Sequence, residues 1–407
     1  MSGEGAEGRN FSEAARFQRD LYLYLRVARE EDGLALTTRG YVSRPALRRA
    51  RVALHAVDGW QSLASDGEPP ESSDGRFFFI RRLLERLSLL HAGQTPVRAV
   101  GRLVAAPRDE VAAYFARPLV ERLRLCARAW VGGGWWLDTL DARASIPGVM
   151  TPATPRVALA RRRLIEWLAA LRPGDAMVLP TAPSSTLPRA RVRRNARPLE
   201  ADHETARAAL EGPLKWLGFV KAEEGKPIGY RAEAACGALA SSVDAELAEA
   251  HGRVTIQPDL SIIAYPPLTA PLLAALDRYA DLGQLDRVAR YKLSRAALAR
   301  SGRSAWEADA LAERLERLTG APLPENIRVI LRDWQRQGER IRAVEDAAVL
   351  ELDDAALLDT LLTDRAAHGW IERRLSATAA LIAVGHVTDV RAWLLRHGEL
   401  PATLRGR

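Results

Sequence analysis

The sequence has little of what disulfides, metal sites and ATP hydrolysis require. Its only cysteines, Cys126 and Cys236, lie far apart in stretches typical of helix interiors, so we expect neither a disulfide nor a thiolate metal site. The seven histidines are scattered, without the H-E-x-x-H or Cys-His spacing that holds zinc. No G-x4-G-K-[ST] motif is present, so the lysine that contacts ATP phosphates in P-loop proteins is missing. We therefore expect no bound metal, no cofactor and no enzymatic activity.

Long apolar runs are also missing. No window approaches the roughly 20 apolar residues that cross a bilayer, and residues 1–10 lack the apolar core of a signal peptide. Hydrophobic residues make up 47% of the chain and charged residues 27%, which is typical of a globular protein. We therefore expect a cytoplasmic protein that does not bind membranes.

Lysine is the scarce cation, because only Lys215, Lys221, Lys226 and Lys292 are present and arginine supplies the rest of the positive charge. The formal net charge of +8 favours an anionic partner such as nucleic acid. A GC-rich genome, which favours arginine and alanine, explains the same bias, so both interpretations stay open.

The sharpest hydrophobic pattern lies between residues 253 and 334. Two runs rich in β-branched residues, 253–257 and 260–265, predict strands joined by a tight connection. A helix is predicted over residues 268–282, with Thr269 as its N-cap. The pattern then predicts a short apolar run at 289–293 and helices at 294–301, 304–319 and from 324 onward. We expect the strands and Trp334 to lie in the core of this module.

Three phrases carry a family resemblance: VTIQPDLSIIAYPPL, RYKLSRAALARSGRSAWE and LERLTGAPLPENIRVILRDW, in this order. They resemble the accessory domain that precedes the motor in helicases of the XPB family. A similar module occurs in bacterial helicase-associated proteins. The resemblance implies a DNA-related accessory role beside a separate helicase or other ATPase, and it implies no chemistry.

The rest of the chain predicts further units around this module. Residues 1–62, 76–146 and 156–250 form three helix-rich units, the module occupies 251–342, and a small α/β unit occupies 343–407. The phrase LALTTRGY and the basic helix after it resemble the beginning of a winged helix, although no internal repeat is visible. The predicted fold class is therefore α+β and mainly helical. It comprises tandem winged-helix-like units, a small α/β module similar to the XPB N-terminal domain, and a βαβα tail.

Candidate DNA contacts are the arginines of the helix that begins after Ser43 and of a proline-interrupted basic run at residues 188–198. Solvated surface positions are the alternative for both groups. Arg287 and Arg290 precede Tyr291 in a predicted turn where packing does not explain their charge, so they are candidates for partner binding. The candidates on the helix are Arg44, Arg48, Arg49 and Arg51, and those in the basic run are Arg191, Arg193, Arg194 and Arg197.

Two other motifs favour structural roles. Gly132, Gly133 and Gly134 precede Trp135 and Trp136 with no lysine, which favours a tight turn with an aromatic plug over a nucleotide loop. Adjacent acidic residues at 353–354 favour the start of a helix over a metal site.

The sequence leaves three functions to compare. The first is a non-catalytic accessory protein that binds DNA, a separate helicase or ATPase, or both. The second is a winged-helix transcriptional regulator that binds duplex DNA. The third is a protein scaffold that never touches DNA.

Overall fold

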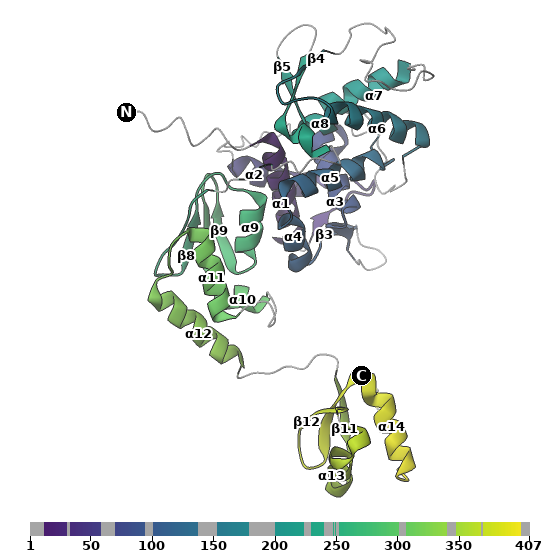
Figure 1. Cartoon of the computed structure of the whole chain (residues 1–407), viewed down its shortest axis with the longest axis vertical. Helices are drawn as coiled ribbons and strands as arrows, with labels where there is room; N and C mark the ends of the chain where they lie inside the picture. The colour runs from purple at the N-terminus through teal and green to yellow at the C-terminus, as the bar shows by residue number, and fades with distance from the viewer. Residues whose placement is uncertain are drawn as a thin grey trace. The chain divides into compact units, whose positions relative to one another are not determined.

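The computed structural model describes residues 12–30, 33–57, 70–93, 101–136, 153–178, 200–223, 229–239, 247, 249, 252–300, 307–339, 347–367 and 369–399. The chain divides into two compact units, residues 1–332 and 333–407 (Figure 1). The described residues form helices and four small antiparallel sheets, which confirms the predicted α+β, mainly helical class. None of the described helices combines the length and apolar character that a bilayer-spanning helix needs.

A three-stranded sheet near the N-terminus joins residues 34–35 to residues 90–92 and 102–105. Leu34 pairs with Leu103 in this sheet, whose strand order is β1-β3-β2. Gly33 precedes the first strand with a φ of +108°, and a Cβ there would lie 2.7 Å from the Leu103 carbonyl oxygen, so glycine is required. The elements are α1 (Glu13–Glu30), β1 (Leu34–Ala35), α2 (Arg44–Val57), α3 (Gly75–Arg86), β2 (Leu90–Ala92) and β3 (Arg102–Ala105).

The same order of elements occurs a second time. Its elements are α6 (Pro155–Ala169), β4 (Ala176–Val178), α7 (Glu200–Glu211), α8 (Pro213–Trp216), β5 (Val220–Glu223) and β6 (Gly229–Ala232). The strand order β4-β6-β5 repeats β1-β3-β2, so both segments read α-β-α-α-β-β with the same sheet topology. The sequence from residue 230 has a helical pattern, but its first residues belong to strand β6. Helices α4 (Arg108–Phe115) and α5 (Leu119–Val131) lie between the two repeats in the chain.

The two repeats pack through their third helices. Helix α3 is buried on nearly every side and contacts α1, α5 and α8. Phe79 of α3 lies in an aromatic cluster with Trp135, Trp136 and Trp216, with ring centroids 5.4–5.5 Å away. The third helix of each repeat therefore faces the other repeat.

The module predicted from residue 253 contains a four-stranded sheet of order β7-β8-β10-β9. Its predicted strands and most of its helices are confirmed. The helix predicted over 268–282 is too long, because residues 280–285 form a strand that pairs with β10. Trp334, predicted in the core, is only half-buried. The elements are β7 (Val254–Ile256), β8 (Ser261–Ala264), α9 (Ala270–Asp277), β9 (Ala280–Leu285), β10 (Ala289–Leu293), α10 (Arg295–Arg300), α11 (Ala308–Thr319) and α12 (Glu325–Glu339).

The C-terminal unit has a three-stranded sheet of order β11-β13-β12. The predicted βαβα tail is a β-α-β-β-α unit, because a hairpin of two strands, residues 371–374 and 379–383, stands where the prediction has one second strand. Asp354 accepts a hydrogen bond from the Ala356 amide (2.8 Å), which confirms that the acidic pair begins a helix. The elements are β11 (Ala347–Glu351), α13 (Ala355–Thr363), β12 (Ile371–Arg374), β13 (Ala379–Ala383) and α14 (Val387–Arg396).

Candidate partner and nucleic-acid interfaces

The β7–β10 sheet buries one face and leaves the other accessible. Buried and accessible residues alternate along β8 and β10, as in a sheet with one face against a core. Strand pairing places four accessible residues in one row across the sheet: Thr255, Ile263, Arg290 and Gln284. We call the face of the sheet that carries these four residues the open sheet face.

The β9–β10 hairpin carries two uncompensated cations: Arg287 lies in its turn, as predicted, whereas Arg290, predicted in the same turn, lies in strand β10. Asp286 accepts hydrogen bonds from the Val288 amide (2.9 Å) and the Gln284 side chain (2.6 Å), so it fixes the turn without either arginine. Arg287 and Arg290 are exposed, and neither has a hydrogen bond or ion pair to another described residue. Packing within the described chain does not explain these charges, so partner binding by them stays a prediction.

A buried polar cluster ties the module to the N-terminal helices. The Tyr22 hydroxyl of α1 donates to the Asp277 carboxylate at the end of α9, and it lies 3.3 Å from the Leu273 carbonyl. Burial raises the pKa of Tyr22 well above its ordinary value, and the negative charge of Asp277 adds to this. Arg26 Nη1 lies 3.7 Å from the same carboxylate, and Arg108 of α4 donates to the Asp277 carbonyl (2.6 Å). These contacts hold α9, on the buried side of the module, against α1 and α4.

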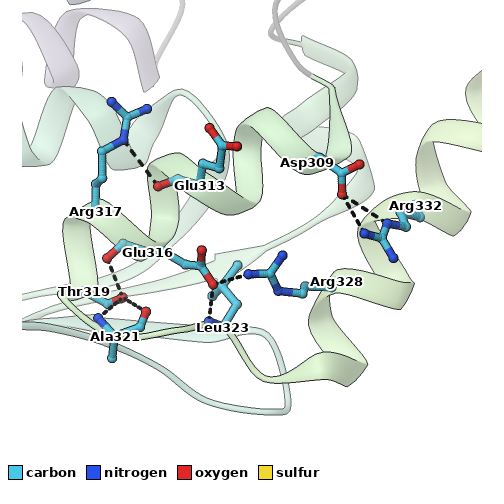
Figure 2. Close-up of polar contacts among 9 residues, drawn as sticks. All are labelled: Asp309, Glu313, Glu316, Arg317, Thr319, Ala321, Leu323, Arg328 and Arg332. Atoms are coloured by element: carbon cyan, nitrogen blue, oxygen red, sulfur yellow. Dashed lines mark hydrogen bonds and ion pairs between the residues drawn. The ribbon is translucent and has the colours of Figure 1, made fainter.

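Ion pairs at the α11–α12 corner are internal to the module (Figure 2). The Glu316 carboxylate accepts from the Leu323 amide (2.7 Å) and from Arg328. These hydrogen bonds, first that from Leu323, lower the pKa of Glu316. Arg332 donates through two nitrogens to Asp309 (2.9 and 3.1 Å). The cations drawn here that belong to α12 therefore join the two helices.

The arginines of α2 are not equivalent. Arg44 and Arg48 are exposed, whereas Arg49 is half-buried and has an interaction within the chain. The expectation that Arg51 contacts phosphates is wrong, because its guanidinium is buried and pairs with Asp74 (2.6 Å). The candidates of the second basic run lie outside the described residues: Arg191, Arg193, Arg194 and Arg197.

The triple-glycine motif is a tight turn, as predicted. Trp135 and Trp136 are buried, and a Cβ on Gly133 would lie 2.0 Å from the Trp135 ring nitrogen. Arg161 of α6 donates to the carbonyls of Trp130, Gly133 and Trp136 (2.7, 2.6 and 2.5 Å). The sequence places Arg161 on the polar face of its helix, but it is fully buried because the turn needs its donors.

A groove between the two repeats was not predicted. It has a volume of about 560 Å³ and lies among α1, α2, α3, α8 and β5. The sequence offers one signal for it: lysine is scarce in this chain, and two of the four lysines, Lys215 and Lys221, line the groove. Its lining residues are Glu13, Arg16, Asp20, Leu54, His55, Arg76, Phe77, Lys215, Trp216, Val220, Lys221 and Ala222.

Two features that often mark catalytic sites, a metal-ligand cluster and a reactive thiol, can be examined among the described residues. No cluster of three or more His, Cys, Asp or Glu side chains among them is placed to hold a metal ion. Both cysteines are buried free thiols. Burial raises the pKa of Cys126, and it raises the pKa of Cys236 to about 12. Neither thiol is therefore a nucleophile near neutral pH.

Residues 254–376 match the family described as "Helicase conserved C-terminal domain". The match begins at β7 and ends in the turn between β12 and β13, so it takes in the whole β7–β10 sheet and part of the C-terminal unit. No curated protein sequence matches the chain. The match supports a helicase-related domain at these residues.

Proposed function

We propose that the protein is a non-catalytic accessory factor that binds DNA and a separate helicase or other ATPase motor. The observation that carries this proposal is the helicase-related match at residues 254–376 in a sequence without the P-loop motif. Residues related to a helicase but lacking the phosphate-binding lysine are suited to assist a motor in trans.

The open sheet face and the β9–β10 hairpin are the surface that we assign to the motor. Arg287 and Arg290 are exposed and unpaired among the described residues, and α9 is held on the opposite side by α1 and α4. An exposed cationic hairpin on an anchored sheet fits an acidic partner surface, because complementary charge selects the partner and speeds association.

The N-terminal repeats have the element order and strand order of winged helices, and we propose that both repeats are winged-helix domains. Helix-turn-helix proteins read duplex DNA by placing one exposed helix in the major groove. Here α3 is buried, and α8 is a single turn packed against α1 and α3. These observations favour an accessory factor over a transcriptional regulator that reads duplex DNA with these helices. Arg44 and Arg48 remain candidates for phosphate contacts.

The partner is tested by affinity purification of the tagged chain from its native host after nuclease treatment, followed by mass spectrometry. We expect a helicase or other ATPase to be enriched with the wild-type chain. Reversing both hairpin charges (Arg287→Glu with Arg290→Glu) should reduce its recovery about tenfold or more, because like charges across an interface cost several kcal/mol.

The matched control reverses Arg156 and Arg162, two exposed cations of α6 without a partner among the described residues. Its recovery of the motor should equal that of the wild type. Absence of any ATPase from the wild-type sample would refute the accessory role. Full recovery with the hairpin variant would move the contact to another face.

A further inference from the structure

The groove between the repeats has an apolar floor and a cationic rim. Leu54, Phe77, Trp216 and Val220 supply apolar surface on its floor. The volume of about 560 Å³ falls within the range of sites that hold one small ligand, roughly 300–1,000 Å³.

The acidic residues of the groove are neutralised by arginines. Asp20 is buried and pairs with Arg76, and Glu13 pairs with Arg16 (3.2 Å). These four side chains therefore contribute no net charge to the groove.

Two lysines supply its uncompensated charge. Lys215 of α8 and Lys221 of β5 are exposed, and neither has a hydrogen bond or ion pair to another described residue. By contrast, Lys292, outside the groove, pairs with Asp259 (3.3 Å). The groove thus presents two free ammonium groups above an apolar floor, which fits a ligand with an anionic group and a planar apolar body.

Trp216 gives the floor a fixed aromatic surface. Its ring packs nearly perpendicular to Trp136 (79°, centroids 5.6 Å apart) and lies 5.4 Å from the Phe79 ring. The side chain is half-buried and lines the groove. A held, partly accessible indole can stack a base of any sequence.

We propose that this groove binds a nucleotide, with its phosphate held by Lys215 and Lys221 and its base on Trp216. The nucleotide is either free or one unit of a single DNA strand, and both present the same phosphate and base. The second source rests on the proposed association with DNA. The site lies outside residues 254–376 and depends on the packing of the two repeats against each other.

The test compares two probes by fluorescence anisotropy: fluorescein-labelled dT8 and mant-labelled AMP. We expect the variant Lys215→Gln with Lys221→Gln to weaken binding of the wild-type ligand about tenfold or more. For dT8, the dependence of log Kd on log salt should become less steep by about 0.7 for each phosphate that the variant no longer neutralises. The matched control, Arg156→Gln with Arg162→Gln, removes two exposed charges elsewhere and should stay within about twofold of wild type.

A second variant, Trp216→Leu, tests the base contact and should weaken binding about fivefold or more. Its thermal unfolding is measured as well, because Trp216 also packs against Phe79 and Trp136. Binding of mant-AMP with displacement by AMP identifies a free nucleotide as the ligand. Binding of dT8 alone identifies a single strand.

The proposal is refuted if the wild-type chain binds neither probe, or if the lysine variant and the control bind equally. Motor recovery by the chain with intact Arg287 and Arg290 is scored separately. If the groove binds neither probe, the proposed accessory role is unaffected. If no motor is recovered, the proposal that the groove binds a nucleotide is unaffected.

Discussion

Replacing Asp277 should detach the helicase-related module from the N-terminal helices. The Asp277 side chain is largely buried, and its carboxylate accepts a hydrogen bond from the Tyr22 hydroxyl while Arg26 lies 3.7 Å away. Asp277→Ala removes this acceptor and leaves the buried Tyr22 hydroxyl with the longer contact to the Leu273 carbonyl, 3.3 Å away.

The expected loss of unfolding free energy is about 1.5–3 kcal/mol, which is what a hydrogen bond to a charged group contributes. No penalty for an unpaired donor is added, because the Tyr22 hydroxyl keeps the Leu273 carbonyl as a second acceptor at 3.3 Å. Arg26 limits the loss, because it also pairs with Glu30 and keeps one carboxylate partner. Asp277→Asn keeps the shape and an acceptor oxygen, so we expect about half the effect.

A double-mutant cycle with Tyr22→Phe isolates this contact. Urea unfolding of the wild type, both single variants and the double variant should give a coupling energy of roughly 1.5–3 kcal/mol. A coupling energy near zero would refute the reasoning, because Tyr22 and Asp277 would then stabilise the fold independently. Limited proteolysis of Asp277→Ala should also release the module earlier than from the wild type.

Four further outcomes are expected. Arg161→Met should cost about 3 kcal/mol or more in urea unfolding, because three buried carbonyls lose their donor. Trp334→Ala should cost only roughly 1–2 kcal/mol, less than the 3–5 kcal/mol of a fully buried tryptophan, because its side chain is half-buried. The Cys236 thiol should resist iodoacetamide at pH 8 in the folded protein, because its pKa is about 12. This pKa lies above the unfolded value of roughly 8.5, so the stability that the protonated thiol contributes is complete below about pH 8.5 and is lost as pH rises toward 12. The purified chain should not hydrolyse ATP in phosphate-release assays, because the P-loop motif is missing, and hydrolysis abolished by a substitution in this chain would contradict this.

Local patterns predicted the module well. The runs at 253–257 and 260–265 became β7 and β8, because β-branched residues bounded by proline and aspartate leave few alternatives to a hairpin. Gly320 ends α11 in the left-handed conformation, as its position predicts. These signals lie within a few residues of the elements that they specify.

Long-range pairing was not predictable in the same way. Residues 280–282 continue the helical spacing of α9, but they pair with β10 and form a strand. The repeat of α-β-α-α-β-β was also invisible, because it lies in strand order and not in residue identity. For the same reason, the groove between the repeats could not be assembled from sequence, although its two lysines stood out by their scarcity.

The charge of a side chain was the least reliable guide to whether that side chain lies at the surface. Arg51 and Arg161 were placed on polar faces, yet both are buried and bind acceptors brought from elsewhere in the chain. A guanidinium offers five donors in a fixed geometry, so it can satisfy several buried acceptors at once. An arginine count therefore overstates the surface available to DNA.

The burial of α3 follows from its own sequence, GRFFFIRRLLER. Four consecutive apolar residues, 77–80, cover every side of a helical turn, and a helix that is apolar all round is buried. Two of its four arginines are buried and used internally, because Arg81 pairs with Glu71 (3.0 Å) and Arg82 pairs with Glu85. A helix that reads a DNA groove needs polar side chains free to reach bases and phosphates. The sequence of α3 thus argues on its own for a packing role, and the helix supports the aromatic cluster that orients Trp216 at the groove.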